Sequence, residues 1–320
     1  MLEIKTAPQI KTATPPTLPK QPAPSLTKEI KPAPIKQVKV EPDYVEEEDS
    51  FSAKTIPFYL MHIACFTVIF VGVSLPAVLL CLGLYAIRMF GLTAGYHRYF
   101  SHRSFKTSRF VQFLLALLGT MAVQKGPLWW AAHHRRHHKY TDQEGDVHSP
   151  VKDGFWWSHI GWVISRRFDR TDWNAIKDFA RFRELRWLNT YHVIPAIALA
   201  VACFFGGVLF GESGWQWLVW GFVISTVLLY HGTFTVNSLA HMWGSRRYPT
   251  TDDSRNNFWI ALWTGGEGWH NNHHHYMASV KQGFFWWEVD FSYYALRVMS
   301  WFRLVWDLRM PPKHLLTATK

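Results

Sequence analysis

Three short motifs in this chain bring histidines close together. HRYFSH contains two of them, and two HxxHH boxes contain the others: His97, His102, His134, His137, His138, His270, His273 and His274. Positions i, i+3 and i+4 share one side of a helix, so each HxxHH box is expected to present three imidazoles to one point. This spacing is typical of metal ligands. HxxxxH fits one helical face less well, so His102 is expected where its helix frays or bends.

A fourth motif, NSLAH, adds Asn237 and His241, which makes nine candidate histidine ligands. Nine are too many for one tetrahedral zinc ion and sufficient for two ions of higher coordination that keep an open position. Imidazole binds iron, zinc and copper, so the spacing alone does not identify the element. The cysteines lie in apolar runs and are expected to be packed thiols rather than ligands: Cys65, Cys81 and Cys203.

Long uncharged runs must position these histidines. No charged residue occurs over residues 56–87, and continuing to Gly95 leaves room for two membrane crossings of about 20 residues each. The sequence GVSLP at residues 72–76 predicts the break between them. Two more uncharged runs, residues 191–210 and 215–240, flank the turn GESG. The predicted fold is all-α, with four transmembrane helices in two hairpins and a cytosolic helical cap that carries the dimetal site.

The distribution of charge predicts the orientation in the membrane. Two hairpins leave every other segment on one side, where lysine and arginine concentrate over residues 88–186, whereas GVSLP and GESG carry neither. The positive-inside rule therefore places both termini and all histidine motifs on the cytosolic side. The net charge of +11 follows this orientation, and no recognised nucleic-acid motif accompanies it, so nucleic acid is not expected as a partner. The uncharged run 111–123 is too short to span and is expected to lie against the membrane or dip into it.

The first part of the chain has a different composition. Nine of the 17 prolines and seven lysines, but no arginine, lie within residues 1–50. Such a stretch cannot offset the entropy of ordering, so residues 1–53 are predicted to be a disordered tail before a membrane domain over residues 54–320. The tail lacks the apolar stretch of a secretory signal and makes a poor transit peptide. The short chain favours a bacterial cytoplasmic membrane, with the endoplasmic reticulum as the alternative.

The setting of the site narrows its chemistry. A membrane site with no cysteine ligand, and with a single ExxH sequence (Glu267 to His270) where carboxylate-bridged bundles use two, indicates an all-nitrogen di-iron centre for oxygen activation. Zinc has no redox chemistry and cannot attack an unactivated C–H bond. Other histidines are expected outside this set. His62, His192 and His231 are predicted to be hydrogen-bonded core residues, and His133 and His275 to be surface groups or outer neighbours of the ligands.

Four motifs carry a resemblance to a known family. GLTAGYHRYFSHRSFK, HRRHHKYTDQEGDVHSP, VNSLAHMWGSRRY and GGEGWHNNHHHY resemble the integral-membrane fatty acyl desaturases, in particular the Δ9 branch with stearoyl-CoA desaturase and the acyl-lipid desaturases of cyanobacteria and plants. The likeness covers residues 57–307. It implies that the nine histidines hold two iron ions and that Asn237 reaches one of them through water. It also implies insertion of a cis double bond into a saturated acyl chain, with O2 as oxidant and release of two waters.

The resemblance implies an external supply of two electrons. No HPGG-type haem-binding module occurs in the sequence, so the donor is expected to be a separate ferredoxin or b-type cytochrome. The animal acyl-CoA enzymes have an Arg-Asp pair before HxxHH that contacts the coenzyme, whereas this chain has Ala132 and His133. Acyl-CoA and acyl-lipid substrates both stay open. Two alternatives to a desaturase are a related histidine-box hydroxylase or ketolase and a non-enzymatic membrane metal carrier.

Further residues are candidates for binding the substrate. At about 1.5 Å per helical residue, Tyr85 and Met89 stand roughly 12 to 18 Å from the metal end, near the reach of an acyl tail beyond its ninth carbon. The resemblance implies that they close the tunnel and that Trp130 lines its mouth. Arg166 and Arg167 could clamp phosphate or face anionic headgroups.

Acidic residues near the boxes are candidates for orienting the ligands. A carboxylate that accepts a hydrogen bond from an imidazole fixes its tautomer. TDQEGD follows the second box, and one more acid precedes the third, which gives Asp142, Glu144, Asp146 and Glu267. Each of them could instead be a helix cap or a surface charge.

Overall fold

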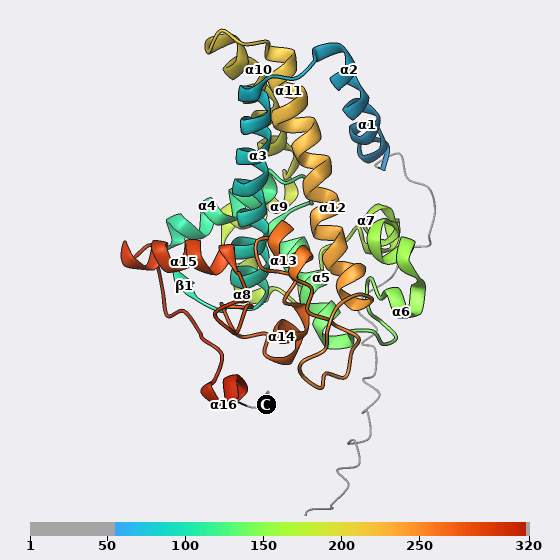
Figure 1. Cartoon of the computed structure of the whole chain (residues 1–320), viewed down its shortest axis with the longest axis vertical. Coiled ribbons are helices and arrows are strands. Elements are labelled where there is room, and N and C mark those ends of the chain that lie inside the picture. Colours follow the sequence, from blue (N-terminus) through green and yellow to red (C-terminus); the bar gives the residue numbers. More distant parts are fainter. Residues whose placement is uncertain (1–54, 318–320) are drawn as a thin grey trace, which may run out of the picture. The chain divides into compact units, whose positions relative to one another are not determined.

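The computed structural model describes residues 55–317, so the tail predicted over residues 1–53 lies outside the described residues. This part of the chain is mostly helical (Figure 1). Its one sheet pairs β1 (Lys106–Thr107) with β2 (Val305–Trp306) antiparallel. The cysteines are free thiols, with Cys81 and Cys203 buried, as predicted.

The helices of the first half begin with the short α1 and end with α9. They are α1 (Ile56–Ala64), η2 (Cys65–Thr67), α2 (Val68–Val71), α3 (Leu75–Phe90), η3 (Gly91–Ser101), α4 (Arg109–Thr120), α5 (Pro127–Tyr140), α6 (Pro150–Asp153), η4 (Trp157–Gly161), α7 (Trp162–Ile164), η5 (Arg166–Phe168), α8 (Lys177–Ala180) and α9 (Arg183–Thr190).

The helices of the second half begin with the long α10. They are α10 (Val193–Leu209), α11 (Gly214–Leu218), η6 (Val219–Ile224), α12 (Ser225–Asn237), η7 (Leu239–His241), α13 (Phe258–Trp263), α14 (His270–His275), α15 (Phe291–Trp301) and α16 (Lys313–Thr317).

Two continuous helices are long and apolar enough to cross a membrane. They are Leu75–Ser101, which joins α3 to η3, and Gly214–His241, which runs from α11 to η7. They pack side by side (Figure 1). Helices α9 and α10 form a third span if the pair, bent by 70°, counts as one, whereas Ile56–Val71 is shorter. The structure confirms a mostly helical chain with two or three candidate spans, and four spans with a cytosolic cap stay a prediction.

Both hairpin turns lie where the sequence predicts a break. Gly72 adopts φ +67°, which favours glycine, and the Ser74 side chain caps the next helix. In the GESG turn, Ser213 caps α11 in the same way. The two turns are joined, because Gln216 Nε2 donates to the Val71 carbonyl at 2.8 Å. The apolar helices are therefore tied together at the end away from the histidines.

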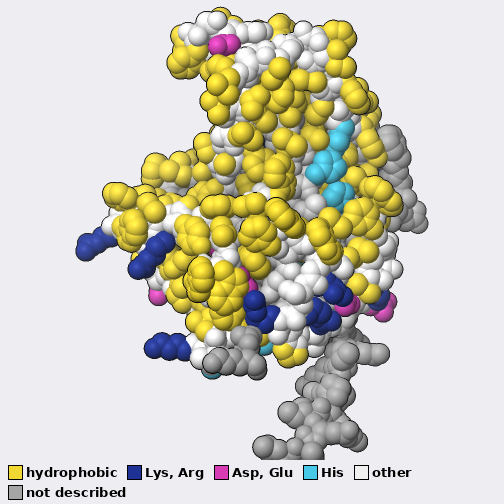
Figure 2. Space-filling model, in the orientation of Figure 1, with side chains coloured by type: hydrophobic (Ala, Val, Ile, Leu, Met, Phe, Trp, Pro, Cys, Tyr) yellow, Lys and Arg dark blue, Asp and Glu magenta, His cyan; other side chains and the backbone are white. Residues whose placement is uncertain are grey.

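The outer surface of these helices is strongly apolar. Phe70, Ile69 and Leu209 are 87%, 75% and 81% exposed. Hydrophobic side chains dominate the upper part of the face in Figure 2, and lysine and arginine gather in its lower part. A continuous exposed apolar surface of this kind fits contact with lipid.

Helix α4 packs closely across η3, the segment that carries His97. A Cβ atom at Gly119 would lie 2.3 Å from the Tyr96 ring, and one at Gly91 would lie 2.5 Å from the Gly119 nitrogen. Only glycine at these positions allows the two backbones to approach. At 12 residues α4 is too short to span a bilayer, as predicted for residues 111–123, and it forms a fixed support behind the first histidine motif.

Candidate metal centre

The nine predicted histidines meet in two groups. In each group one ring nitrogen per residue lies within 4.8 Å of all the others. The first, called the five-histidine group, contains His97, His102, His134, His138 and His273. The second, called the four-histidine group, contains His137, His241, His270 and His274. They come from η3 and the residue after it, α5, η7 and α14, which are far apart in the sequence.

Each HxxHH box serves both groups, so the expectation that a box presents its imidazoles to one point is wrong. On α5, His134 and His138 join the five-histidine group and His137 joins the other. On α14 the roles are exchanged: His270 and His274 join the four-histidine group and His273 the five-histidine group. Helical geometry explains the division, because i and i+4 point about 40° apart, whereas i+3 points about 60° to the other side. Two facing helices can therefore share two centres.

The nitrogen spacings in the five-histidine group fit a common ion. His102 and His138 each place Nε2 beside Nε2 of His134, at 2.9 and 3.0 Å. Nε2 of His273 lies 3.0 Å from Nε2 of both His97 and His138. Two nitrogens about 2.1 Å from one ion and at right angles would be about 3.0 Å apart. Several Nε2 atoms that share neighbours cannot all be satisfied by single protons, but they can all bind one cation.

The four-histidine group has the same character. Nε2 of His241 and His270 are 3.0 Å apart. The buried Nε2 atoms of His137 and His274 have no hydrogen-bond partner among the described residues. Buried polar atoms normally have partners. Unpaired nitrogens within 4.8 Å of other imidazoles therefore indicate room for a metal ion.

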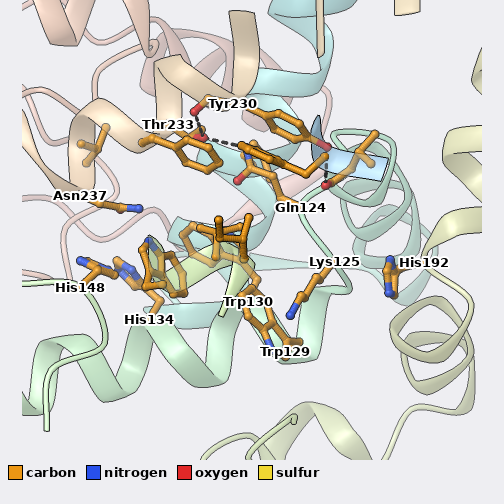
Figure 3. Close-up of a pocket in the computed structure, with 18 of the residues that line it drawn as sticks. Gln124, Lys125, Trp129, Trp130, His134, His148, His192, Tyr230, Thr233 and Asn237 are labelled. Carbon is orange, nitrogen blue, oxygen red and sulfur yellow. Dashed lines mark hydrogen bonds between the residues drawn. The ribbon is translucent and has the colours of Figure 1, made fainter. Parts of the chain in front are cut away.

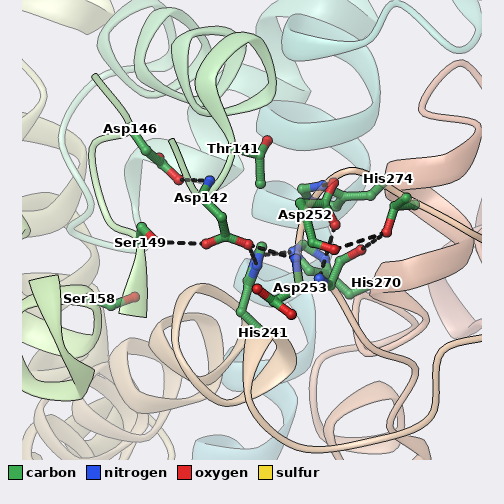
Figure 4. A network of polar contacts seen from close by, with 12 residues as sticks. Thr141, Asp142, Asp146, Ser149, Ser158, His241, Asp252, Asp253, His270 and His274 are labelled. Atoms are coloured by element: carbon green, nitrogen blue, oxygen red, sulfur yellow. Dashed lines mark hydrogen bonds and ion pairs between the residues drawn. The ribbon is translucent and has the colours of Figure 1, made fainter. Parts of the chain in front are cut away.

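In four of these histidines a carboxylate contacts Nδ1, the ring nitrogen that is not directed at the other imidazoles. Three of the four carboxylates belong to acids that the sequence predicts. His137 Nδ1 donates to Asp146 at 2.8 Å, and His241 Nδ1 donates to Asp142 at 3.0 Å. His97 Nδ1 contacts Glu267. These are three of the four predicted acids, and Figure 4 shows Asp142 beside His241. The fourth, Glu144, is exposed and is absent from the histidine contacts of the described residues.

Asp252 is a partner that the sequence did not reveal. Its Oδ2 accepts a hydrogen bond from His274 Nδ1 at 3.0 Å. The two residues are 22 positions apart and no motif connects them. His148 was also missed, and its ring stacks on that of His137 with centroids 4.2 Å apart.

The ionisation of the site favours metal binding. Burial lowers the pKa of His102, His134, His138 and His273 well below the usual range, and neighbouring imidazoles lower it further. These rings are therefore neutral at pH 7, which is the form that binds metals. Burial raises the pKa of Asp142, but the contact with His241 and the hydrogen bonds from Asp253 N and Ser149 together outweigh it and lower the pKa to about 2. The carboxylate is therefore charged and accepts the imidazole proton.

Comparison with known proteins identifies the family of the chain. Residues 74–305 match the family described as fatty acid desaturase. The chain belongs to this family. The Delta-9 acyl-lipid desaturase 1 of Arabidopsis thaliana is 34% identical to this desaturase over 264 residues, which cover 81% of this chain and 83% of that protein. The sn-1 stearoyl-lipid 9-desaturase of Anabaena variabilis is 38% identical over 263 residues, with 81% and 94% coverage. An acyl-CoA C20 Delta5-desaturase of Anemone leveillei is 38% identical over 240 residues, with 72% and 73% coverage.

A cavity of about 600 Å³ in the desaturase reaches both histidine groups. His97, His134, His137 and His270 form its inner end. Figure 3 shows Trp130 and Asn237 beside His134, with Lys125 and His192 toward the other end. Gln124 donates a hydrogen bond to Thr233 at 2.7 Å in the lining.

The predicted substrate residues are distributed unevenly around this cavity. Trp130 and Arg166 line it, as does Asn237, but Arg167 does not. The lining along α3 and η3 begins at Leu92 and Thr93. Tyr85 and Met89 lie beyond it, where both face Gly232 of α12, and Tyr85 donates to the Trp263 carbonyl at 2.7 Å. They are buried, one to two helical turns past the lining.

The remaining histidines of the desaturase occupy separate places. As predicted, His62 and His231 are hydrogen-bonded: their Nε2 atoms lie 3.2 Å apart, and His231 Nδ1 lies 3.0 Å from His159 Nε2. His192 lines the cavity. His133 lies 2.8 Å from the Trp129 carbonyl, and His275 stacks on Tyr248. None of these belongs to the two ligand groups.

Proposed function

We propose that this desaturase inserts a cis double bond at the Δ9 position of a saturated acyl chain, with two iron ions, O2 and two external electrons. The observation that carries the proposal is the pair of histidine groups at the inner end of an apolar cavity. The Δ9 position follows the names of the Arabidopsis and Anabaena relatives, which are both 9-desaturases. In the overall reaction the chain loses two hydrogens, and O2 takes up these, two electrons and two protons to leave as two waters.

The nine histidines are proposed as iron ligands, with Asn237 reaching one ion through water. When bound, the iron pair supplies the redox chemistry that reduces O2 and removes hydrogen from the chain. The protein's own groups prepare the site. Asp142, Asp146 and Glu267 hold imidazole Nδ1 atoms, so each opposite Nε2 faces inward as a ligand. Nitrogen-only ligation and redox demand favour iron over zinc.

The cavity is proposed as the acyl site. Trp130, Leu92 and Phe234 supply apolar surface that orients the chain and excludes water near the metals. Tyr85 and Met89 are proposed to stop the tail of the acyl chain, because they lie one to two helical turns before Leu92, where the lining along α3 and η3 begins. Replacing Met89 with alanine is expected to admit longer chains, whereas alanine at the exposed Leu82 leaves product lengths unchanged. Equal product lengths in all three proteins would remove this role.

The head of the substrate is proposed to lie near Arg166, with Arg167 close by in sequence. The relatives include enzymes named for acyl-lipid and for acyl-CoA substrates. Acyl-lipid and acyl-CoA are therefore both proposed as possible forms of the substrate. The proposed setting is a multi-pass protein with its termini and metal centre on the cytosolic side, in a bacterial cytoplasmic membrane or the endoplasmic reticulum. A ferredoxin or b-type cytochrome is proposed as the electron donor.

Expression of the full chain in a host unable to make unsaturated fatty acids tests the proposal. Mass spectrometry of the lipids is expected to show chains with a cis double bond at carbon 9. The His270→Ala variant, which lacks a proposed ligand, is the matched control and should give none. Hydroxylated or oxidised chains would instead support a hydroxylase or ketolase. Bound iron without oxygen consumption would support a metal carrier.

A further inference from the structure

The loop between η7 and α13 closes on itself beside the metal centre. Residues 245–256, called the clasp, are joined at their ends because Ser245 N donates to the Asn256 carbonyl at 2.9 Å and Asn256 N donates back at 2.7 Å. Gly244 permits this closure: it adopts φ +136°, and a Cβ atom there would lie 2.3 Å from the Asn256 oxygen. The loop is therefore an ordered element.

The clasp is bound to α14 through the two asparagines of HNNHH. Asn271 Oδ1 accepts hydrogen bonds from the backbone nitrogens of Arg247 and Tyr248, both at 2.8 Å. Asn272 Oδ1 accepts from Asn256 Nδ2 at 2.7 Å. Both asparagines are fully buried. The positions of the box that are not ligands thus fix the clasp to the helix that carries His270 and His274.

The middle of the clasp reaches two of the histidines in the four-histidine group. Asp252, which is 8% exposed, accepts from His274 Nδ1 at 3.0 Å, and its other oxygen accepts from Ser254 N at 2.9 Å. Asp253 N donates at 2.8 Å to Asp142 Oδ2, the oxygen that also accepts from His241 Nδ1 (Figure 4). The clasp therefore supports one ligand directly and another through Asp142.

We infer that the clasp retains the metal ion of the four-histidine group, and that Asp252 is the positioning residue through which it orients His274. The inference rests on the proposed two-iron function. Asp252 fixes the Nδ1–H tautomer of His274, which directs the unpartnered, buried Nε2 atom toward the other imidazoles. Loss of such an outer partner typically lowers metal affinity about 10- to 100-fold. Among the described residues, neither Asp252 nor Asp142 has a hydrogen bond to a histidine of the five-histidine group.

The test compares Asp252→Asn with Asp253→Asn in the full chain loaded with iron. The Asp253 carboxylate faces the exposed Arg246 at 3.4 Å, and its backbone contact to Asp142 survives substitution. Bound iron per chain is measured by mass spectrometry after dialysis against graded ferrous chelator. Asp252→Asn is expected to lose one of its two irons at a chelator concentration about 10- to 100-fold lower than the wild type requires. Asp253→Asn should lose iron as the wild type does.

Further measurements distinguish positioning from folding. If Asp252 positions His274, Asp252→Asn lowers the thermal midpoint of the iron-loaded chain but not that of the iron-free chain, and Asp252→Glu restores part of the retention. Equal iron loss in the wild type and Asp252→Asn, or an equal fall of both midpoints, would overturn the inference. Analysis of the products tests the proposed function separately. If the wild type desaturates and Asp252→Asn keeps both irons, the inference about the clasp is wrong and the proposed function stands. If the wild type binds no iron, both the inference about the clasp and the proposed function are wrong.

Discussion

The two histidine groups use the same ligand chemistry but have different surroundings. In the four-histidine group three of the four rings donate to carboxylates, Asp142, Asp146 and Asp252. In the five-histidine group the one carboxylate contact of this kind among the described residues joins His97 to Glu267. Glu267 also pairs with the buried Arg98 at 3.0 Å, and Arg98 pairs with Asp290 at 2.9 Å. The carboxylate of one group is thus partly neutralised, whereas the other group faces three acids.

This difference shows that the histidines and the acids around them have separate roles. The histidines determine which kind of ion can bind, because the type of ligand selects the metal. Both groups consist of imidazoles in similar number, so both are expected to bind the same kind of ion. The outer acids determine ring orientation and local charge, and negative charge favours a more positive ion. Two ions bound by almost identical ligands can therefore differ in retention.

The largest expected effect is removal of a ligand. His241→Ala leaves three imidazoles in the smaller group, whereas His102→Ala leaves four in the larger. Desaturation by His241→Ala is expected to fall by more than the roughly 100-fold typical of losing an outer partner, with one iron lost per chain. His102→Ala should keep more of its iron, as measured by mass spectrometry of the protein. The comparison fails if both variants lose iron equally.

Removing the single carboxylate of the five-histidine group comes next. Glu267→Gln is expected to reduce iron affinity and activity about 10- to 100-fold, because no second acid substitutes for it at His97. The variant also removes part of the charge that compensates buried Arg98, so the free energy of unfolding should fall by about 1–3 kcal/mol. Chelator titration and thermal denaturation measure the two effects. An affinity like that of the wild type would show that Glu267 does not support the ligand.

A smaller effect is expected for Asp142→Asn in the four-histidine group. Asp146 and Asp252 still hold His137 and His274, so this group keeps two of its three carboxylates. The loss of iron affinity should therefore lie near the lower limit, about 10-fold. The same chelator titration measures it. A larger loss than in Glu267→Gln would reverse the ranking of the two groups.

The smallest effect is expected for Glu144→Gln. Glu144 lies between Asp142 and Asp146 in the sequence, but it is exposed and belongs to none of the described histidine contacts. Its substitution should change the free energy of unfolding by no more than about 0.5 kcal/mol and leave activity unchanged. Activity assays and thermal denaturation measure these effects. A clear loss of activity would show that Glu144 supports the metal centre.

Local patterns in the sequence were sufficient for much of the architecture. Glycine and proline at residues 72–76 predicted the turn before α3 because their backbone preferences are local. The uncharged runs predicted the long helices Leu75–Ser101 and Gly214–His241, since length and composition decide whether a helix can cross lipid. Spacing on a helix also selected the six histidines of the two HxxHH boxes, all of which lie in the two groups.

Only the tertiary structure decided how those histidines divide and what supports them. Helical spacing places i and i+4 together, but the way in which α5 and α14 meet, with His138 Nε2 3.0 Å from His273 Nε2, determines which centre each ring faces. Asp252 could not be found from the sequence, because it reaches His274 through the fold of a loop 22 positions away. The same holds for Glu144, whose neighbours Asp142 and Asp146 face histidines while it faces solvent. Ligand spacing is a property of one helix, whereas the outer contacts depend on where separate segments meet.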